Sequence, residues 1–334
     1  MNDMVILGIE TSCDDTGVAL VQGGRRILAN VVQSQVAVHR EFGGVVPEVA
    51  SRKHIANIGV VLEECMERSG LGLNEVDVIA VTNRPGLIGA LLVGVSFAKG
   101  LAYALGKPLL AINHLEGHIY ANFLEHEGIE FPLVCLIVSG GHTSLVYMRN
   151  HGVMEVMGQT RDDAAGEAFD KISRFLGLGY PGGPAIEKAA RLGREGVYQL
   201  PRAYLEKDGF EFSFSGLKTA TMNLWNRLKK SGQEVDVNHL AAEFQAAVVD
   251  VLVEKTIAAA RHRGVRTVLL AGGVAANTRL RERMSEGCRE IGLNLFYPSI
   301  ALCTDNAAMI AACAAYRWGL DSPAPLQLNA YPGL

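Results

Sequence analysis

Residues 5–21 read VILGIETSCDDTGVALV: an apolar run from Val5 to Ile9, then a polar segment that starts at Glu10, then a second apolar run from Val18. Short apolar runs on either side of a polar, glycine-containing segment are typical of two buried strands joined by a turn. Residues 27–32 form a third run after another turn. The sequence therefore predicts a three-stranded meander at its start.

Beyond this meander the pattern changes from the period of strands to the period of helices. Apolar residues recur at helical spacing between residues 49 and 69, and Gly70 ends that segment. Strands and helices then alternate, which is typical of an α/β fold. The further elements expected are strands at 76–81, 109–112 and 267–271, and helices ending at Leu105, at 278–289 and at 305–318.

The opening pattern occurs a second time, at residues 133–148, with a turn at 139–143. Two meanders, each followed by helix and strand units, predict a duplicated fold of two lobes around a nucleotide cleft. We expect the first lobe to span residues 1–112, completed by the C-terminal helix and tail at 307–334. The second is expected at 113–306, with a helical insertion at 161–238 that carries specificity.

The composition of the 334 residues excludes several classes of protein. A net charge of -4 argues against a protein that binds nucleic acid over its whole surface. It leaves open the binding of RNA at one local basic patch. The six cysteines form no C-x-x-C pair, as expected in a reducing compartment. The N-terminus lacks the features of a signal peptide, and the apolar segment 85–98 is shorter than the ~20 residues that span a bilayer. We therefore expect a soluble, cytoplasmic protein.

Three runs of basic residues lie in the second half of the chain. We interpret them as solvated helix faces, because most such runs are, and infer no RNA binding from them alone. They are Arg261, Arg263 and Arg266; Arg279, Arg281 and Arg283; and Arg227, Lys229 and Lys230.

His114 and His118 lie four residues apart directly after an expected strand. On a helix this spacing puts both imidazoles on one face, where they can share a metal ion. Two independently hydrogen-bonded histidines are the alternative. Asp305, at an expected helix start, is either a third ligand or an N-cap. Two histidines and one aspartate would leave coordination positions open for a substrate.

The same segment does not have the signature of a metalloprotease. That signature is H-E-x-x-H, with the acid directly after the first histidine, where this chain has Leu115. Glu116 lies one position later and would point to another face of the helix. The protease interpretation is therefore rejected.

Two glycine turns follow expected buried strands, at Ser139-Gly140-Gly141 and at Gly272-Gly273. Such turns let backbone N–H groups approach a phosphate, and Asn277 is a candidate partner for a ribose or a base. No P-loop motif is present. Asp14 and Asp15 on the first polar turn could bind a metal, orient water or act as a general base, whereas turn formation is the structural alternative.

Five segments occur together in an order that is similar to the bacterial members of the Kae/TsaD/Gcp family, the tRNA threonylcarbamoyladenosine transferases. They are GIETSCDDT at 8–16, PEVASRKH at 47–54, NHLEGH at 113–118, VSGGHT at 138–143 and GGVAAN at 272–277. The resemblance covers essentially the whole chain. It implies the fold of the actin, Hsp70 and sugar-kinase superfamily. It also implies transfer of a threonylcarbamoyl group from its adenylate to the exocyclic amine of adenosine 37 in tRNAs reading ANN codons, with release of AMP.

The resemblance also implies roles for individual residues. His114, His118 and Asp305 would hold one divalent metal, iron by resemblance with zinc as the alternative, beside ATP or an adenylate. Asp14 and Asp15 would be catalytic, with Asp14 accepting or relaying the proton of the amine. The implied substrate-binding positions are Ile137, Val138, Ser139, Gly140, Gly141, Asp170, Gly183, Glu187 and Asn277.

Two positions depart from many relatives of the family. Asp15 stands where many have Glu, so a base role there has a shorter reach. Ile137 stands where archaeal and eukaryotic relatives have a Tyr ligand, so one more metal position is expected to be open. The implied partners are tRNA, a TsaB-like actin-fold paralogue, a TsaE-like P-loop ATPase and a TsaC/Sua-type enzyme that supplies the adenylate. An ATP-driven scaffold and a carbamoyltransferase for small molecules are the alternative functions.

Overall fold

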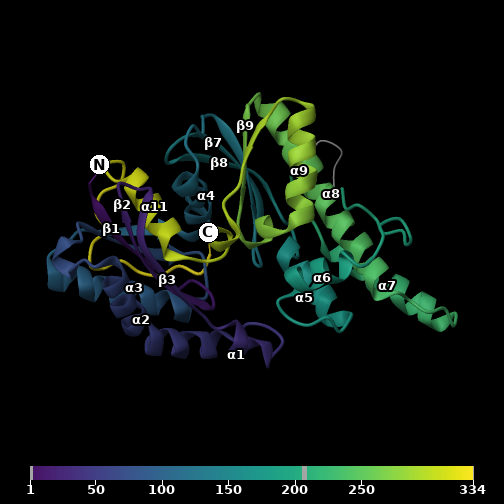
Figure 1. The fold of residues 1–334 in the computed structure, drawn as a ribbon, viewed down its shortest axis with the longest axis horizontal. Coiled ribbons are helices and arrows are strands. Elements are labelled where there is room, and N and C mark those ends of the chain that lie inside the picture. Colours follow the sequence, from purple (N-terminus) through teal and green to yellow (C-terminus); the bar gives the residue numbers. More distant parts are fainter. Residues whose placement is uncertain (1–2, 205–208, 334) are drawn as a thin grey trace. The chain divides into compact units, whose positions relative to one another are not determined.

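The structure, a computed structural model, describes residues 3–204 and 209–333. The chain divides into two compact units, one formed by Met1–Gly128 with Pro298–Leu334 and the other by Ile129–Tyr297. Each unit contains one five-stranded sheet with helices packed against it (Figure 1).

The sheet of the first unit has the strand order β3-β2-β1-β4-β5. Its first three strands form the antiparallel meander predicted from residues 5–32, and the last two run parallel to β1. The strands are β1 (Val5–Glu10), β2 (Asp15–Gln22), β3 (Arg26–Ser34), β4 (Val78–Arg84) and β5 (Leu109–Asn113).

Strand β1 is buried on both faces, as its unbroken apolar sequence predicts. Leu7 and Ile9 join a core cluster with residues of α2 and α3. Gly8 points to the other face, where a Cβ would lie 2.3 Å from the carbonyl oxygen of Ala307 in α11. The lack of a side chain at Gly8 therefore allows α11 to lie directly on the sheet.

The helices of the first unit come from both ends of the chain. Because α11 packs on β1 and β2, the C-terminal helix completes this unit, as the sequence predicts. The helical elements are α1 (Val36–Arg40), α2 (Pro47–Ser69), η1 (Leu73–Glu75), α3 (Ile88–Leu105), α4 (His114–Glu125), α10 (Ile300–Cys303) and α11 (Ala307–Arg317).

The sheet of the second unit, read from β8, has the order β8-β7-β6-β9-β10, which repeats that of the first. Again a meander of three antiparallel strands is followed by two parallel strands. This shared topology confirms the predicted duplication and the actin-like fold class. The strands are β6 (Leu133–Val138), β7 (Thr143–Asn150), β8 (Val153–Gln159), β9 (Thr267–Ala271) and β10 (Asn294–Phe296).

Six helical elements complete the second unit. The long helix α8 packs on β6, β7 and β9. Only part of the predicted insertion at 161–238 is helical, because the described residues between α6 and α7 form no helix. The elements are α5 (Ala165–Phe175), α6 (Gly182–Ala190), α7 (Ser215–Lys230), α8 (Val237–Arg263), η2 (Gly273–Ala276) and α9 (Thr278–Glu290).

The structure corrects the predicted boundaries of the lobes. The chain leaves the first unit after Gly128 rather than near Ile112, and returns at Pro298 rather than near residue 307. The reason is that α4 packs against α11, and α10 contacts α4, so all three belong to the first unit. Both histidines and Asp305 are therefore in the same unit.

Helix α3 is longer than the apolar segment 85–98 picked out in the sequence. With 18 residues it is long and apolar enough to cross a membrane by length and composition alone. In this chain α3 packs on β4 and on α2, and its residues Leu91 and Val95 belong to the core cluster. It is a packed helix of the first unit, as the sequence predicts.

Candidate active site

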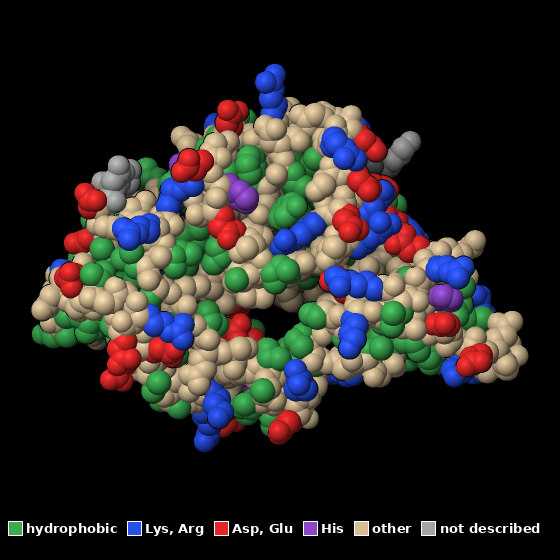
Figure 2. Space-filling view, viewed as in Figure 1, with side chains coloured by type: hydrophobic (Ala, Val, Ile, Leu, Met, Phe, Trp, Pro, Cys, Tyr) green, Lys and Arg blue, Asp and Glu red, His purple; other side chains and the backbone are tan. Residues whose placement is uncertain are grey.

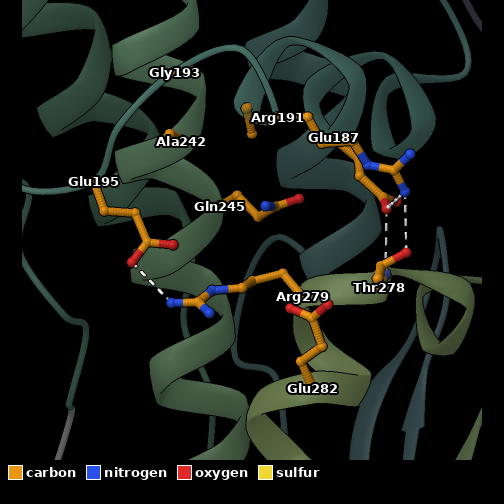
Figure 3. A pocket seen from close by; sticks show the side chains of 10 residues that line it. Glu187, Arg191, Gly193, Glu195, Ala242, Gln245, Thr278, Arg279 and Glu282 are labelled. Atoms are coloured by element: carbon orange, nitrogen blue, oxygen red, sulfur yellow. Dashed lines mark hydrogen bonds and ion pairs between the residues drawn. The ribbon is translucent and has the colours of Figure 1, made fainter.

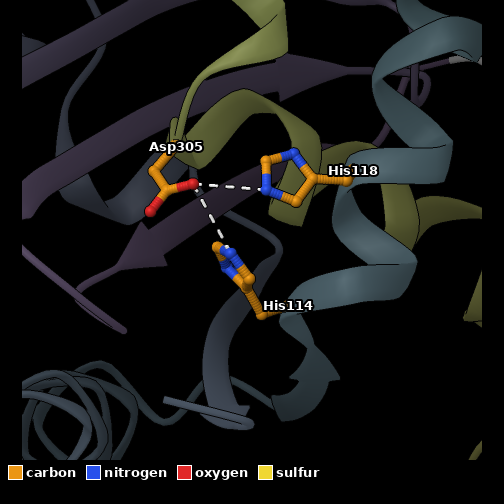
Figure 4. A group of neighbouring side chains, drawn as sticks. All are labelled: His114, His118 and Asp305. Atoms are coloured by element: carbon orange, nitrogen blue, oxygen red, sulfur yellow. Dashed lines mark ion pairs between the residues drawn. The ribbon is translucent and has the colours of Figure 1, made fainter. Parts of the chain in front are cut away.

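His114 and His118 begin the first two turns of α4, directly after β5. The side chain of Asn113 caps this helix by accepting a hydrogen bond from the Leu115 amide. The two imidazoles lie on one face, with ring centroids 4.6 Å apart. Asp305 lies opposite, its Oδ1 3.2 Å from His118 Nε2 and 3.5 Å from His114 Nε2 (Figure 4). The two histidines predicted to share one face do so, and the structure brings Asp305 to them.

The surroundings of His114 hold its ring in one orientation. Its Nδ1 lies 3.0 Å from Glu10 Oε2 and 3.1 Å from the Ser12 hydroxyl, which leaves Nε2 directed at Asp305. Glu10 is itself buried and accepts a hydrogen bond from the Thr82 hydroxyl at 2.5 Å. A carboxylate behind a histidine is the usual support of a metal ligand, because it fixes the ring and makes it more basic.

His118 is fully buried, and neither of its ring nitrogens makes a well-directed hydrogen bond, although Nε2 lies 3.2 Å from Asp305 Oδ1. A buried polar group without such a partner is costly, and it is typical of a ligand or catalytic group. One donor atom from each of His114, His118 and Asp305 lies within 4.8 Å of the others. The residues present therefore fit a divalent metal with two nitrogen ligands and one oxygen ligand.

The ionisation of these groups reflects their close packing. Burial lowers the pKa of the His118 imidazole. Burial also acts on His114, but the carboxylates of Glu10 and Asp305 outweigh it and raise the pKa of His114 well above its ordinary value. The two histidines hold the pKa of Asp305 below its usual range despite burial. Asp305 is therefore an ionised carboxylate, as a metal ligand must be.

Asp305 is not the N-cap of α11, which was the alternative explanation of its position. The cap is Asn306, whose side-chain oxygen accepts a hydrogen bond from the Met309 amide at 3.0 Å. The Asn306 amide group also donates to the Thr304 carbonyl at 2.8 Å. Because Asn306 performs the capping, the Asp305 carboxylate is available to the histidines.

Glu116 points away from the two histidines, as the rejection of the protease motif requires. Its carboxylate pairs with Arg317 Nη1 at 2.6 Å, which ties α4 to the end of α11. Glu116 is thus a structural residue of the helix pair.

Asp14 lies at the end of the turn between β1 and β2 and Asp15 is the first residue of β2, in the same unit as the histidines. Burial raises the pKa of Asp15 to about 7, and the nearby charge of Asp305 adds to the effect. Burial also raises the pKa of Asp14. One oxygen of Asp15, Oδ1, is buried without a hydrogen-bond partner. A raised pKa and a buried oxygen without a partner make Asp15 a candidate functional residue.

His54 fixes this turn from α2. Its Nδ1 lies 2.8 Å from the Thr16 hydroxyl and its Nε2 lies 2.9 Å from the Cys13 carbonyl oxygen. The two contacts bracket Asp14 and Asp15, so the orientation of both carboxylates depends on a residue that the sequence did not single out.

The two glycine turns of the second unit lie at the carboxyl ends of neighbouring parallel strands, β6 and β9. Gly272 has a φ of 89°, and a Cβ there would lie 2.5 Å from the Val138 carbonyl oxygen. Gly166 likewise packs against the backbone of Ser139. Ligands of open α/β sheets gather at such strand ends.

Within the loop 137–141, the residues differ in accessibility. The side chains of Ile137 and Val138 are buried in β6, so they can offer a ligand only their backbone. Ser139, Gly140 and Gly141 are partly or fully exposed. The Ile137 side chain has no donor atom, so a metal ligand at this position could come only from the backbone.

Glu187 and Asn277 come together although 90 residues separate them. Asn277 caps α9 through the Leu280 amide, and its Nδ2 donates to Gln245 Oε1 at 2.9 Å and to Glu187 Oε2 at 3.5 Å. Glu187, Gln245 and Thr278 line a pocket of about 350 Å³ with Arg191 and Arg279 (Figure 3). Sequence analysis named Glu187 and Asn277 but missed Gln245, which carries no motif.

Asp170 lies in α5, and Gly183 lies in the first turn of α6. Asp170 Oδ1 accepts a hydrogen bond from the Gly182 amide at 2.6 Å, which fixes the turn from α5 into α6. A Cβ added to Gly183 would meet open space, so this position faces no packed neighbour. The structure thus gives Asp170 a local structural role that does not exclude contact with a ligand.

Comparison with known proteins identifies the family of the chain. The family model described as TsaD, tRNA N6-adenosine threonylcarbamoyltransferase, matches residues 26–312. The chain belongs to this family. A family member from Syntrophomonas wolfei is 64% identical over 334 residues, which is 100% of this chain and 98% of that protein. Another, from Moorella thermoacetica, is 55% identical over 98% of this chain and 96% of its own length. As a member of the TsaD family, the chain is a tRNA-modifying transferase.

Solved structures outside the TsaD family share the fold. Full-length HypF in its phosphate- and nucleotide-bound form aligns with a TM-score of 0.63 at 13% identity, over 95% of this chain and 46% of HypF. Component A of (R)-2-hydroxyglutaryl-CoA dehydratase from Acidaminococcus fermentans aligns with a TM-score of 0.55 at 15% identity, over 96% and 100% of the two chains. These similarities concern the fold alone.

The residues that support the histidines were not predicted from the sequence. Glu10, Ser12 and Thr82 orient His114, directly or through one another. The signal available for Glu10 was an acidic residue at the end of an apolar strand, where a buried carboxylate needs partners. Nothing in the local sequence connects it with a histidine that lies 104 residues later.

Proposed function

We propose that this transferase moves a threonylcarbamoyl group from threonylcarbamoyl-adenylate to the exocyclic amine of adenosine 37 in tRNAs that read ANN codons. The amine nitrogen forms a bond to the carbamoyl carbonyl carbon, the bond from that carbon to the phosphate oxygen breaks, and AMP leaves. The observation that carries the proposal is the buried group His114, His118 and Asp305 in a member of the TsaD family.

The metal ligands in this proposal are His114 Nε2, His118 Nε2 and Asp305. A divalent metal bound there, iron by resemblance or zinc, would supply Lewis-acid polarisation of the acyl group. The residues of the chain position it: Glu10 orients His114, and Asn306 keeps the Asp305 carboxylate free. Ile137 offers no further ligand, so positions stay open for substrate.

The adenylate is assigned to the second unit. The amides of Ser139, Gly140 and Gly141, together with the adjacent backbone of Ile137 and Val138, are the proposed contacts of its phosphate. Asp170, Gly183, Glu187 and Asn277 are proposed to bind the nucleoside. Support for this assignment comes from Glu187, which lines the pocket, and from Asn277, which donates to Glu187 and to the lining residue Gln245.

The proton released by the amine is assigned to the turn at Asp14 and Asp15. Asp14 is the proposed acceptor or relay, with Asp15 beside it. A base works best when its pKa lies near the working pH, and burial raises the pKa of Asp15 to about 7. This value makes Asp15 a suitable partner in the same relay.

Partners are part of the proposal. The groove between α2 and α3, of about 620 Å³, is lined by Ile55, Leu92 and Phe97. Ile55 is 67% exposed and Val60 is 60% exposed, which is unusual for such large apolar side chains. We assign this groove to a TsaB-like actin-fold paralogue. The other proposed partners are a TsaE-like P-loop ATPase and a TsaC/Sua-type adenylate-forming enzyme. The proposed location of the protein is the cytoplasm, where tRNA is modified.

The test supplies the donor directly. The chain and its partners are incubated with purified threonylcarbamoyl-adenylate and tRNA, and modified nucleoside and AMP are measured by mass spectrometry. We expect equal amounts of both products from tRNA with adenosine 37, and no modified nucleoside from tRNA with guanosine there. His118→Ala is expected to abolish transfer. Glu116→Gln, on the same helix but paired with Arg317, is the matched control and should keep most of it.

The same experiment separates the alternatives. An ATP-driven scaffold would give no product from the adenylate without ATP hydrolysis. A small-molecule carbamoyltransferase would consume the adenylate without modifying the tRNA. Either result would refute the proposed reaction.

A further inference from the structure

The three basic runs of the second unit differ in what their side chains contact. In α9, Arg279 pairs with Glu195 and Arg283 with Glu286. At the end of α8, Arg263 pairs with Glu155. Because these arginines pair with carboxylates of the same chain, both runs are largely accounted for by ordinary surface ion pairs.

The third run, at the end of α7, is different. Within the part of the chain that the structure describes, Arg227, Lys229 and Lys230 have no carboxylate within ion-pair distance. The ammonium of Lys229 lies 5.1 Å from the centre of the Trp225 ring instead. The sequence from Phe212 to Gln233 contains no Asp or Glu. Of the carboxylates that follow, Asp236 is used to cap α8.

Hydrogen-bond donors line one face of α7. Asn223, Asn226, Arg227 and Lys230 follow the spacing i, i+3, i+4, i+7, which puts them on one side of a helix. All four are exposed. The opposite side is anchored, because Leu217, Thr221 and Leu224 are buried and α7 contacts α5. The donor-bearing face therefore points away from the unit.

Aromatic packing fixes the tip of this face. The ring of Trp225 meets the ring of Phe175 in α5 edge to face, with centroids 5.9 Å apart. Arg174, the residue before Phe175, is exposed and adds a further cation at the end of α5. Figure 1 shows α7 as a long green helix that extends away from the sheet of its unit.

We propose that the face of α7 formed by Asn223, Asn226, Arg227 and Lys230, with Lys229 at its edge, binds the phosphodiester backbone of the tRNA substrate. The proposal rests on the activity of the family, which needs a tRNA. The chain carries a net charge of -4, so the protein as a whole does not attract a polyanion. Binding of tRNA therefore needs a local positive surface. Acidic and basic side chains are interspersed over the face in view in Figure 2, so a local positive surface must come from cations that no neighbouring carboxylate pairs with.

The chemistry of the face suits a nucleic-acid backbone. Lysine and arginine neutralise phosphates, and asparagine amides donate to phosphate or sugar oxygens. The Trp225 ring packs on Phe175 and has the Lys229 ammonium 5.1 Å from its centre, so it holds α7 against α5 next to these cations. None of these contacts reads a base sequence, so this face would contribute affinity and position rather than the choice of adenosine 37.

The first experiment compares two triple variants with the same change in charge. R227E/K229E/K230E removes the proposed phosphate contacts. R261E/R266E/R289E, the control, reverses three exposed cations of the second unit that come from separate segments. Binding of unmodified tRNA to the full chain is measured between 50 and 200 mM salt (about the range in which phosphate contacts dominate).

We expect the α7 variant to weaken tRNA binding at least tenfold at about 100 mM salt. The slope of log affinity against log salt should be less steep than that of the wild type by roughly 2 to 3. The variant loses three phosphate contacts, and each contributes about 0.7 to 0.9 to the slope. In the transfer assay its KM for tRNA should rise while kcat at saturating tRNA stays within about twofold of the wild type, since no catalytic group is altered.

A second measurement reports on α7 directly. The chain has two tryptophans, so W318F leaves Trp225 as the sole indole. We expect tRNA to quench or shift its emission, and the change to disappear when R227E/K229E/K230E is added. Equal losses of affinity in both triple variants, or no response of Trp225 to a tRNA that binds, would overturn the proposal.

The outcomes also separate this inference from the proposed function. If the wild type modifies tRNA and the α7 variant binds it equally well, the surface is wrong and the function stands. If the wild type neither binds nor modifies tRNA, the function fails and the surface fails with it.

Discussion

Asp15→Asn should make the protein more stable above neutral pH. Burial and the charge of Asp305 raise the pKa of Asp15 from 3.8 to about 7, and its Oδ1 has no hydrogen-bond partner. Above pH 7 the carboxylate is ionised in the folded state, which therefore carries the cost of a buried charge. Asparagine has nearly the same shape and removes that charge.

The magnitude follows from linkage. Each unit of pKa difference between folded and unfolded states corresponds to about 1.4 kcal/mol. A shift from 3.8 to about 7 gives an upper value of about 4 kcal/mol, and residual solvent screening reduces the expected gain to about 2–4 kcal/mol. The sign is fixed by the raised pKa: the destabilisation is complete above pH 7 and lost as the pH falls towards 4, where the carboxyl is neutral in both states.

The assay is denaturant unfolding of wild type and Asp15→Asn at pH values from 4 to 8.5 (about the span of the two pKa values). The gain should be large at the alkaline end and vanish at the acidic end. Adding a divalent cation should shrink it, because neutralising Asp305 removes part of the cause. Glu127→Gln, at an exposed residue, is the control and should show no such profile. A gain that is independent of pH would refute the reasoning.

Three further outcomes can be measured on the same protein. Asn306→Ala should cost ~1 kcal/mol in thermal melts, because the Met309 amide loses its cap, and should weaken metal binding by loosening Asp305. Asn306→Ser, which keeps a neutral cap acceptor, should recover part of the stability. Gly166→Ala should raise the KM for the adenylate, because the new Cβ would lie 2.5 Å from the Ser139 carbonyl oxygen and displace the loop at residues 139–141. Unchanged kinetics would contradict this packing. Removing metal with a chelator should lower the melting temperature of the wild type but not of His118→Ala, because the variant lacks one of the proposed ligands. Elemental analysis measures the bound metal, and calorimetry measures the melting temperature.

Much of the first unit could be predicted because its signals are local. Strand β1 is an unbroken apolar run, and the pair His114 and His118 shows its helical spacing within five residues. Predictions were weaker where the outcome depends on packing. Strand β8 was not predicted, since its sequence Val153–Gln159 lies largely exposed at a sheet edge and carries little apolar pattern.

The choice between Asp305 and Asn306 shows where local reasoning ends. Both residue types cap helices well, and the sequence does not fix the first residue of a helix to within one position. The structure starts α11 at Ala307, which makes Asn306 the cap and leaves Asp305 one residue outside. A shift of one residue thus decides whether a carboxylate is structural or a candidate ligand.

The duplicated fold also gives a reason for the proposed division of roles between the two units. The turn after β1 and the turn after β6 occupy equivalent places in the two sheets. The first carries Asp14 and Asp15, whose charge would repel a phosphate, whereas the second carries Ser139, Gly140 and Gly141, whose amides attract one. The same turn therefore suits proton and metal chemistry in one copy and anion binding in the other, so an adenylate phosphate would be expected at the second copy alone.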